Sequence, residues 1–297
     1  MGKRDFRPLR VERRITRLGG NFSTEGELDG KAMERTLETL HSFADLLQKE
    51  GAENIFAVAT GVLREAINGR AFIERVFRRT GLSLRLVSGE EEARLMLKGV
   101  LWSIKKRVHT QLVADIGGWS TEILWVEGNE PIKIQSLRLG TVGLSEKFLQ
   151  DDPPGPQELE SMERHTEGIL KKIREEFQKE GLEAYDLHPD LVGTAGTMTT
   201  LAAIDQGLRT YDPQKINGHR IPRQVLEKIY HHLRSLPIQE RRDVPGLEKG
   251  REDLIVAGVV VVLRLMEIFH LPTLVVVDSG LLEGVLLDGI AQMRNSE

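Results

Sequence analysis

The residues best suited to chemistry lie together in residues 112–125, which read Leu-Val-Ala-Asp-Ile-Gly-Gly-Trp-Ser-Thr-Glu-Ile-Leu-Trp. An apolar run ends at Asp115, turns on two glycines and resumes as a second apolar run, which predicts a β-hairpin. Glycines let the backbone turn at positive φ and approach a ligand closely. The backbone N–H groups from Gly117 to Ser120, with the hydroxyls of Ser120 and Thr121, therefore suit phosphate oxygens.

Two acids flank this loop. Asp115 precedes the glycines Gly117 and Gly118, and Glu122 follows them. Carboxylates are ligands that hard divalent cations prefer, so the pair could hold a cation directly or through water. A tight hairpin with solvated acids is the alternative, which a glycine pair standing alone would favour. The strand, the acids, the glycines and the hydroxyls occur in register here, which favours phosphate binding.

Two other stretches carry candidate functional residues. Residues 190–197 read Asp-Leu-Val-Gly-Thr-Ala-Gly-Thr and open a helix at 198–204, so backbone donors and a helix dipole would face an anion. A close strand-to-helix turn is the alternative. Residues 90–92 are three glutamates in the first turn of another helix. The dipole favours acids at that position, so capping and solubility are the alternative to catalysis.

Composition limits the classes of protein that this sequence can encode. With 297 residues, 40% apolar and 29% charged, the chain is long enough for two ordinary domains with their own cores. The absence of cysteine excludes disulfides, thiolate metal sites and a cysteine nucleophile. The apolar run at 254–263 is too short to span a membrane, and no apolar signal core follows the basic N-terminus. We therefore expect a cytoplasmic protein that does not bind membranes.

The charge is distributed unevenly along the chain. The net charge of −4 argues against binding to DNA. The first 17 residues nevertheless contain seven basic residues and only two acids. We interpret this stretch as a solvated strand face, and a docking surface for a polyanion remains open as the alternative.

Hydrophobic periodicity predicts the elements that position these residues. Before the hairpin, the patterns predict strands and helices in alternation. After it, the order is strand, helix, strand, helix, strand, helix, which together with the hairpin makes a mixed five-stranded sheet covered by helices, as in ribonuclease H-like domains. The expected strands outside the hairpin are 10–18, 54–60, 82–87, 132–139, 190–197 and 273–277, and the expected helices include 28–50, 66–80, 158–180, 223–233 and 251–269.

Five motifs carry a resemblance to a known family. They are Val58-Ala-Thr-Gly-Val-Leu-Arg-Glu-Ala66, Ser88-Gly-Glu-Glu-Glu-Ala-Arg-Leu95, Asp115-Ile-Gly-Gly-Trp-Ser-Thr-Glu122, Gly193-Thr-Ala-Gly-Thr197, and Arg251-Glu-Asp253 followed by Gly258. In this order they resemble the exopolyphosphatase and guanosine pentaphosphate phosphohydrolase family of the actin-like ATPase superfamily. The resemblance spans nearly the whole chain, and the ordered combination is far more specific than any one glycine loop.

The resemblance implies a role for each group of residues. Glu92, immediately before Ala-Arg, would be the general base that activates the attacking water. Asp115 and Glu122 would serve Mg²⁺, which neutralises charge on the phosphates. Arg64 would contact the polyphosphate chain. The residues that would bind phosphate are Gly117, Gly118, Trp119, Ser120, Thr121, Gly196 and Thr197.

The resemblance also implies two ribonuclease H-like (actin-like) domains with the active site between them and Glu92 at the hinge. Residues 1–90, joined by the C-terminal helix 284–297, would form the first domain, and residues 91–283 the second. The family opens with a hairpin that carries an Asp-Ile-Gly-Ser-Asn-Ser-like loop, and this sequence starts just beyond its place. A first domain built from this chain alone would lack this hairpin and should be marginally stable, because its sheet edge would expose unpaired backbone groups. Either the coding sequence begins upstream, or the strands have re-paired and catalysis is lost.

Two single positions depart from the family pattern. Trp119 stands where the family usually has a third glycine, so it would crowd the loop or stack on a base. Leu282 stands where the family usually has arginine.

The expected function is hydrolysis of the terminal phosphate of polyphosphate or guanosine pentaphosphate, with release of inorganic phosphate. A non-catalytic protein that binds a phosphorylated nucleotide is the alternative, motivated by the absent hairpin and by Trp119. A small-molecule kinase of the same fold is less favoured, because a kinase would keep the first phosphate loop and need a site for a phosphate acceptor. A homodimer is left open.

Overall fold

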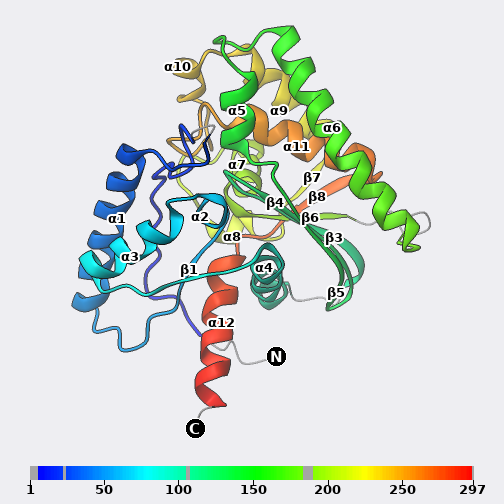
Figure 1. Ribbon diagram of the computed structural model, residues 1–297. Coiled ribbons are helices and arrows are strands. Elements are labelled where there is room, and N and C mark those ends of the chain that lie inside the picture. The colour runs from blue at the N-terminus through cyan, green and yellow to red at the C-terminus, as the bar shows by residue number, and fades with distance from the viewer. Residues whose placement is uncertain (1–5, 23–24, 105–107, 183–189, 296–297) are drawn as a thin grey trace.

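The centre of the molecule is a six-stranded mixed sheet in the order β5-β4-β3-β6-β8-β7 (Figure 1). The computed structural model describes residues 6–22, 25–104, 108–182 and 190–295. Strands β3, β4 and β5 form an antiparallel meander, β6 and β8 run parallel to β3, and β7 closes the edge antiparallel to β8. The strands are β3 Val108–Ile116, β4 Thr121–Gly128, β5 Glu130–Leu137, β6 Leu191–Thr194, β7 Arg220–Pro222 and β8 Thr273–Val276.

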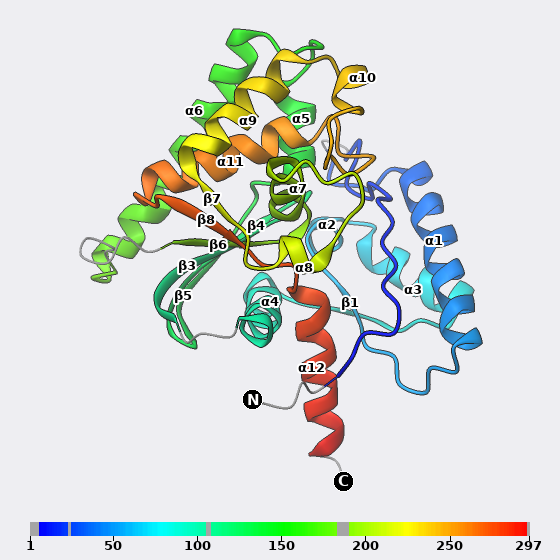
Figure 2. The same cartoon turned by 180° about the vertical axis from the view of Figure 1, so that it is seen from behind.

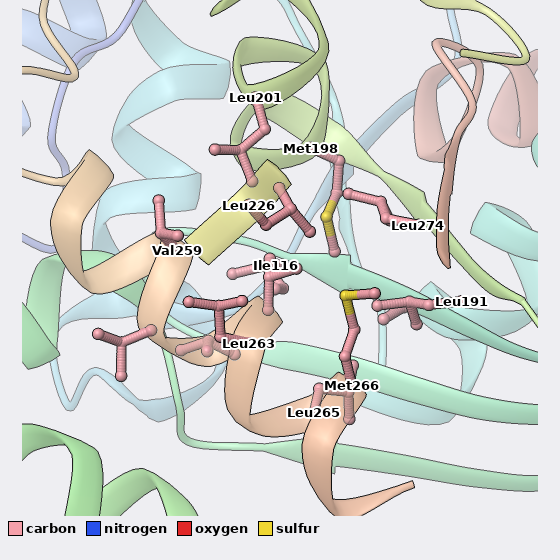
Figure 3. Packing of buried hydrophobic residues seen from close by; sticks show 14 of the residues in the cluster. Ile116, Leu191, Met198, Leu201, Leu226, Val259, Leu263, Leu265, Met266 and Leu274 are labelled. Atoms are coloured by element: carbon pink, nitrogen blue, oxygen red, sulfur yellow. The ribbon is translucent and has the colours of Figure 1, made fainter. Parts of the chain in front are cut away.

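Helices cover both faces of this sheet, as the alternation of side chains along β3 requires. Leu112, Ala114 and Ile116 point into the larger core, where Figure 3 shows Ile116 among methionine and leucine side chains of the covering helices. Val113 points to the opposite face, which α4 covers. The helices of the larger core are α5 Thr141–Phe148, α6 Pro156–Lys179, α7 Ala195–Asp205, α8 Pro213–Ile216, α9 Arg223–Ser235 and α11 Ile255–Ile268, and the short α10 Ile238–Arg241 precedes α11.

The segment before α4 forms a smaller lobe at one side of the sheet (Figures 1 and 2). Strands β1 Ala57–Ala59 and β2 Leu84–Leu86 pair in parallel as a two-stranded sheet. Helices α1 Gly30–Lys49, α2 Val62–Glu65 and α3 Gly69–Thr80 pack on it and share one small apolar core. The elements that follow on the other side of the main sheet are α4 Gly89–Ser103 and α12 Leu281–Arg294.

Two expectations about the strands are wrong. Residues 10–18 form no strand: within the described residues no backbone ladder pairs them, the chain turns at Arg17 with φ of 53°, and side chains hold the segment, as in the ion pair of Arg17 with Asp253 at 2.6 Å. The main sheet has six strands in place of five, because Arg220–Pro222 adds β7 to the edge of β8. A three-residue strand containing proline gives no periodic signal in the sequence.

Other expectations about the architecture are confirmed. The hairpin, the mixed sheet and the helices that cover it follow the predicted order. The division into residues 1–90 with 284–297 and residues 91–283 stays a prediction, although α12 lies beside Phe56 and Val58 next to β1. None of the helices in the described ranges is long and apolar enough to cross a membrane.

Helix α12 crosses α4 with almost no space between the two backbones. A Cβ atom added at Gly284 of α12 would lie 1.7 Å from the carbonyl oxygen of Leu95, and one added at Gly99 of α4 would lie 1.9 Å from the carbonyl oxygen of Gly280. These distances are far shorter than van der Waals contact, so only glycine fits at either position. The crossing therefore fixes α4 against the sheet.

We expect Gly284→Ala to lower the free energy of unfolding by about 1–3 kcal/mol, because the new methyl group must push α12 away from α4. Gly168→Ala is the matched control, since Gly168 also lies inside a helix and a Cβ atom there meets nothing within 4 Å. That substitution should stabilise by up to about 1 kcal/mol through helix propensity. Urea unfolding of both variants measures the difference, and equal stability of the two would contradict the close crossing.

Candidate functional site

The turn between β3 and β4 is held from two sides by backbone hydrogen bonds. The N–H of Gly117 donates to the carbonyl of Ser120 at 2.9 Å and closes the turn. The N–H groups of Thr141 and Val142, in the first turn of α5, donate to the carbonyls of Gly117 and Gly118 at 3.1 and 2.9 Å. The loop carbonyls are therefore directed toward α5 and away from a ligand.

The same loop keeps its N–H groups available. Within the described residues, no hydrogen bond uses the backbone N–H of Gly118, Trp119 or Ser120. Consecutive free N–H groups in a turn form a concave site for anions. Gly140 packs directly against this turn, where a Cβ atom would lie 2.2 Å from the carbonyl carbon of Trp119, so the tight backing requires glycine. The loop thus has the backbone arrangement that an anion site requires, and its role in binding phosphate stays a prediction.

Asp115 and Glu122 face each other across the hairpin, since they are partners in the register of β3 and β4. Strand alternation places both on the sheet face that α4 covers. The Ser136 hydroxyl of β5 donates to Glu122 Oε1 at 2.8 Å. Burial, with repulsion from Glu92, raises the pKa of Asp115 to about 7. Burial, with repulsion from Glu92 and Asp115, raises the pKa of Glu122 to about 8.

Glu92 reaches this face from the first turn of α4. Ser88 caps the helix by accepting the N–H of Glu91 at 3.1 Å, which fixes where the first turn begins. The Glu92 side chain is buried, and its Oε2 accepts from Arg64 Nη1 at 2.6 Å. The same Arg64 nitrogen donates to the carbonyl of Val87 at 3.2 Å. An arginine of the smaller lobe therefore holds the carboxylate of α4.

The junction between β6 and α7 borders the site from the other side. Its first residue, Ala195, has a left-handed backbone with φ of 68°, which is uncommon for a residue with a Cβ atom. A Cβ atom at Gly196 would lie 1.9 Å from Arg251 Nη2, so the Arg251 guanidinium rests on the glycine. The Nε of Arg251 donates a hydrogen bond to Glu248 Oε2 at 2.6 Å, which holds the arginine in place.

The acids and the loop meet in one cavity of about 460 Å³ between the smaller lobe and the main sheet. This volume is within the ordinary range for a site that binds a small ligand. The cavity is lined by seven of the predicted site residues: Glu92, Asp115, Gly117, Gly118, Trp119, Ser120 and Glu122. Arg64, Thr121, Gly196 and Thr197 were predicted at the site but do not line this cavity.

Two of the hydroxyls that were predicted to bind phosphate are buried and bind backbone carbonyls instead. Thr121 is fully buried, and its hydroxyl donates to the carbonyl of Leu139 at 2.5 Å. The hydroxyl of the buried Thr197 donates to the carbonyl of Ile116 at 3.3 Å. The expectation that the Thr121 hydroxyl contacts phosphate is thus not met, because both hydroxyls already bind the backbone that they support.

Two residues at the site were missed by sequence reasoning. Arg251 lines the cavity, and its signal was present in the Arg251-Glu-Asp253 motif. Ser136 left no signal, because its position opposite Glu122 depends on the register between β4 and β5.

Trp119 lines the cavity but does not crowd the loop, because its ring packs on the smaller lobe. The ring meets Phe22 edge-on, with centroids 4.5 Å apart, and packs against the core that contains Val62. The Arg138 guanidinium lies 4.9 Å from the ring centroid and forms an ion pair with Glu65 at 3.3 Å. Neighbours on more than one side therefore leave little of the ring for stacking on a base.

The carboxylates at this site suit a cation that keeps several of its own water ligands. Within the described ranges, no group of three or more His, Asp or Glu side chains is arranged to hold a metal ion directly. Mg²⁺ keeps several of its waters and usually takes one or two carboxylates together with substrate phosphates. Asp115 and Glu122 supply two such carboxylates.

Comparison with known proteins agrees with this geometry. The chain is 30% identical over 296 residues to Exopolyphosphatase 2 of Mycobacterium tuberculosis, an alignment that covers 97% of this chain and 91% of the relative. The crystal structure of the Aquifex aeolicus member of the Ppx/GppA family shares 33% identity and superposes with a TM-score of 0.76, over 94% of this chain and 88% of that one. An exopolyphosphatase from Cytophaga hutchinsonii, 24% identical, shares the fold with a TM-score of 0.81, over 91% and 85% of the two chains.

These likenesses confirm the fold class and the resemblance that the motifs indicated. The model of the Ppx/GppA phosphatase family matches residues 2–293, nearly the whole chain. This chain therefore belongs to the Ppx/GppA phosphatase family.

Proposed function

We propose that this chain hydrolyses the terminal phosphoanhydride bond of inorganic polyphosphate or of guanosine pentaphosphate and releases inorganic phosphate. One observation carries the proposal: a loop of free N–H groups and three carboxylates line the same cavity. N–H donors suit the oxygens of a phosphoryl group, while carboxylates suit a cation and the attacking water. Membership of the family and the names of its relatives point to the same reaction.

The chemistry assigns a different part to each side chain. The N–H groups of Gly118, Trp119 and Ser120 bind the oxygens of the terminal phosphoryl group and orient its phosphorus toward α4. Glu92 accepts a proton from a water molecule as the water oxygen attacks phosphorus, and the bond to the bridging oxygen breaks. The shortened chain leaves with the electron pair of that bond.

Arg64 and Arg251 complete the polar surroundings. Arg64 holds Glu92 in the structure, so it positions the carboxylate and reaches a substrate phosphate only after that ion pair opens. Arg251 lines the cavity beside Gly196 and adds positive charge where the substrate phosphates lie. Asp115 and Glu122 would hold Mg²⁺, and the ion would supply neutralisation of charge on the phosphate oxygens.

The other candidate functions have no support at this site. The regulator hypothesis rested partly on Trp119 as a platform for a base, but that ring packs against Phe22 and Arg138. The kinase hypothesis needs a site for a phosphate acceptor, and the family and relatives that match this chain are phosphatases.

The role of Glu92 is tested by Glu92→Gln, which keeps the size of the side chain and removes its basicity. We expect the rate of phosphate release to fall by at least about 10²-fold while substrate binding is retained. Glu90→Gln is the control, because Glu90 lies in the same helical turn, is exposed and pairs with Arg94. Unchanged turnover in Glu92→Gln would exclude Glu92 as the base.

The role of Asp115 is tested by Asp115→Asn across a Mg²⁺ titration. The amide fills the same volume without a buried charge, so the variant should fold, lose Mg²⁺-dependent hydrolysis and lose the rise in melting temperature that Mg²⁺ gives the parent protein. Asp45→Asn, on the exposed face of α1, controls for the change in net charge. Full activity of Asp115→Asn at every Mg²⁺ concentration would remove Asp115 from the metal site.

A further inference from the structure

One arginine outside the cavity is almost completely buried. The side chain of Arg241, at the end of α10, is 2% exposed. A guanidinium keeps its charge inside a protein, so burial removes its water without neutralising it. Arginines are almost never buried to this extent unless other groups take the place of that water. The groups that Arg241 contacts therefore indicate what the residue does.

The guanidinium of Arg241 joins the end of one helix to the loop that precedes another. Its Nε donates to the carbonyl of Leu233, in the last turn of α9, at 2.8 Å. Its Nη1 donates to the carbonyl of Glu252 at 3.0 Å. Within the described residues, no backbone N–H donates to the Glu252 carbonyl, so Arg241 supplies its hydrogen bond. In the same part of the chain Nη2 has no hydrogen-bond partner, and it lies 3.8 Å from Asp152 Oδ1.

Stability of the fold does not by itself explain a guanidinium at this place. Replacement of a buried charge by an apolar side chain of similar size is often neutral or stabilising. One nitrogen of Arg241 is buried without a hydrogen bond, which adds to the cost of the charge. What a guanidinium offers is a set of donors in fixed directions, here one for each of two carbonyls. Arg241 is therefore suited to hold the Glu252 peptide in one position.

The Glu252 peptide lies in the loop that carries Arg251 to the cavity. This loop, residues 242–254, joins α10 to α11 and forms neither helix nor strand (Figure 2). Arg251 and Leu254 line the cavity. The Arg251 guanidinium lies so close to Gly196 that a Cβ atom there would overlap it. Such a close contact requires an accurate position of the loop backbone.

Side chains from outside the loop hold the peptides that follow Arg251. Arg241 binds the Glu252 carbonyl, and the Ser145 hydroxyl of α5 donates to the next carbonyl, that of Asp253, at 3.0 Å. A displacement of about 1 Å in a group that positions a substrate can change the rate of a reaction greatly. Loss of the Arg241 guanidinium would leave the Glu252 carbonyl without its donor. The adjacent Arg251 would then lose part of the support for its backbone.

We propose that Arg241 is a positioning residue, which holds the Glu252 carbonyl so that Arg251 stays where a substrate phosphate binds. This proposal rests on the proposed function, which places substrate phosphates beside Arg251. Arg241 does not line the cavity, so it acts on the substrate through Arg251. Loss of its guanidinium should therefore weaken the binding of phosphates. Damage to the fold would instead lower the fraction of protein that binds and leave the affinity of the remainder unchanged.

The test measures binding of tripolyphosphate to the full chain by calorimetry, with a chelator present. Arg241→Met removes both donors and the buried charge, so the variant should fold, and its affinity should fall roughly three- to tenfold. Arg241→Lys keeps the charge and one donor group, so it should retain more of the affinity than Arg241→Met. Arg242→Gln is the matched control, because this neighbouring arginine is exposed and its loss removes the same charge.

A double-mutant cycle separates positioning from a general effect on the fold. Arg251→Gln alone should weaken tripolyphosphate binding by at least about tenfold, because a charged donor is lost. In that background Arg241→Met should have almost no further effect, because the group through which Arg241 acts is gone. A role of Arg241 that does not pass through Arg251 would give the same fold-change in both backgrounds.

Several results would overturn the proposal: equal losses in the two backgrounds, or unchanged affinity in either Arg241→Met or Arg251→Gln. Failure of both Arg241→Met and Arg241→Lys to fold would also overturn it, since the guanidinium would then serve the fold itself. Absence of tripolyphosphate binding by the parent protein would do the same. Hydrolysis is measured separately with Mg²⁺, so absence of phosphate release would refute the proposed hydrolysis and leave the role of Arg241 standing.

Discussion

The structure must hold three carboxylates close together in one cavity. Burial disfavours the charged forms of Asp115 and Glu122, and repulsion among Glu92, Asp115 and Glu122 adds to that cost, so the pKa values of the last two are raised to about 7 and about 8. Such a cluster persists only where the surrounding structure fixes it. Hydrogen bonds from Ser136 and Arg64 oppose the repulsion, while the rigid crossing of α12 over α4 keeps Glu92 from moving away.

The centre of the site could be predicted because local rules determine it. Two apolar runs separated by glycines specify a hairpin, and the side-chain period of two then places Asp115 and Glu122 on one face. Glu92 could be placed at the start of a helix from Ser88 and the acidic first turn. Its approach to the other two acids follows from the motifs of the family, since no local rule brings α4 onto that face.

The parts that could not be predicted depend on contacts between distant segments. Residues 10–18 alternate like a strand, yet a strand requires a neighbour with a free edge, and side-chain contacts such as Arg17 with Asp253 hold the segment instead. Thr121 looked like a ligand residue because it ends a glycine loop. Its hydroxyl instead satisfies the Leu139 carbonyl, which a reader of the sequence cannot place beside it.

The short helix α2 connects the chemistry of the smaller lobe with that of the main sheet. Its Arg64 holds Glu92, and the adjacent Glu65 pairs with Arg138, which covers the ring of Trp119 at the tip of the anion loop. Neighbouring residues on one helical turn thus contact both the proposed base and the phosphate loop. Because packed elements shift as units, a movement of α2 against the sheet must change the surroundings of Glu92 and of the loop together. The positions of Glu92 and of the loop are therefore coupled through Arg64 and Glu65 of a single helical turn.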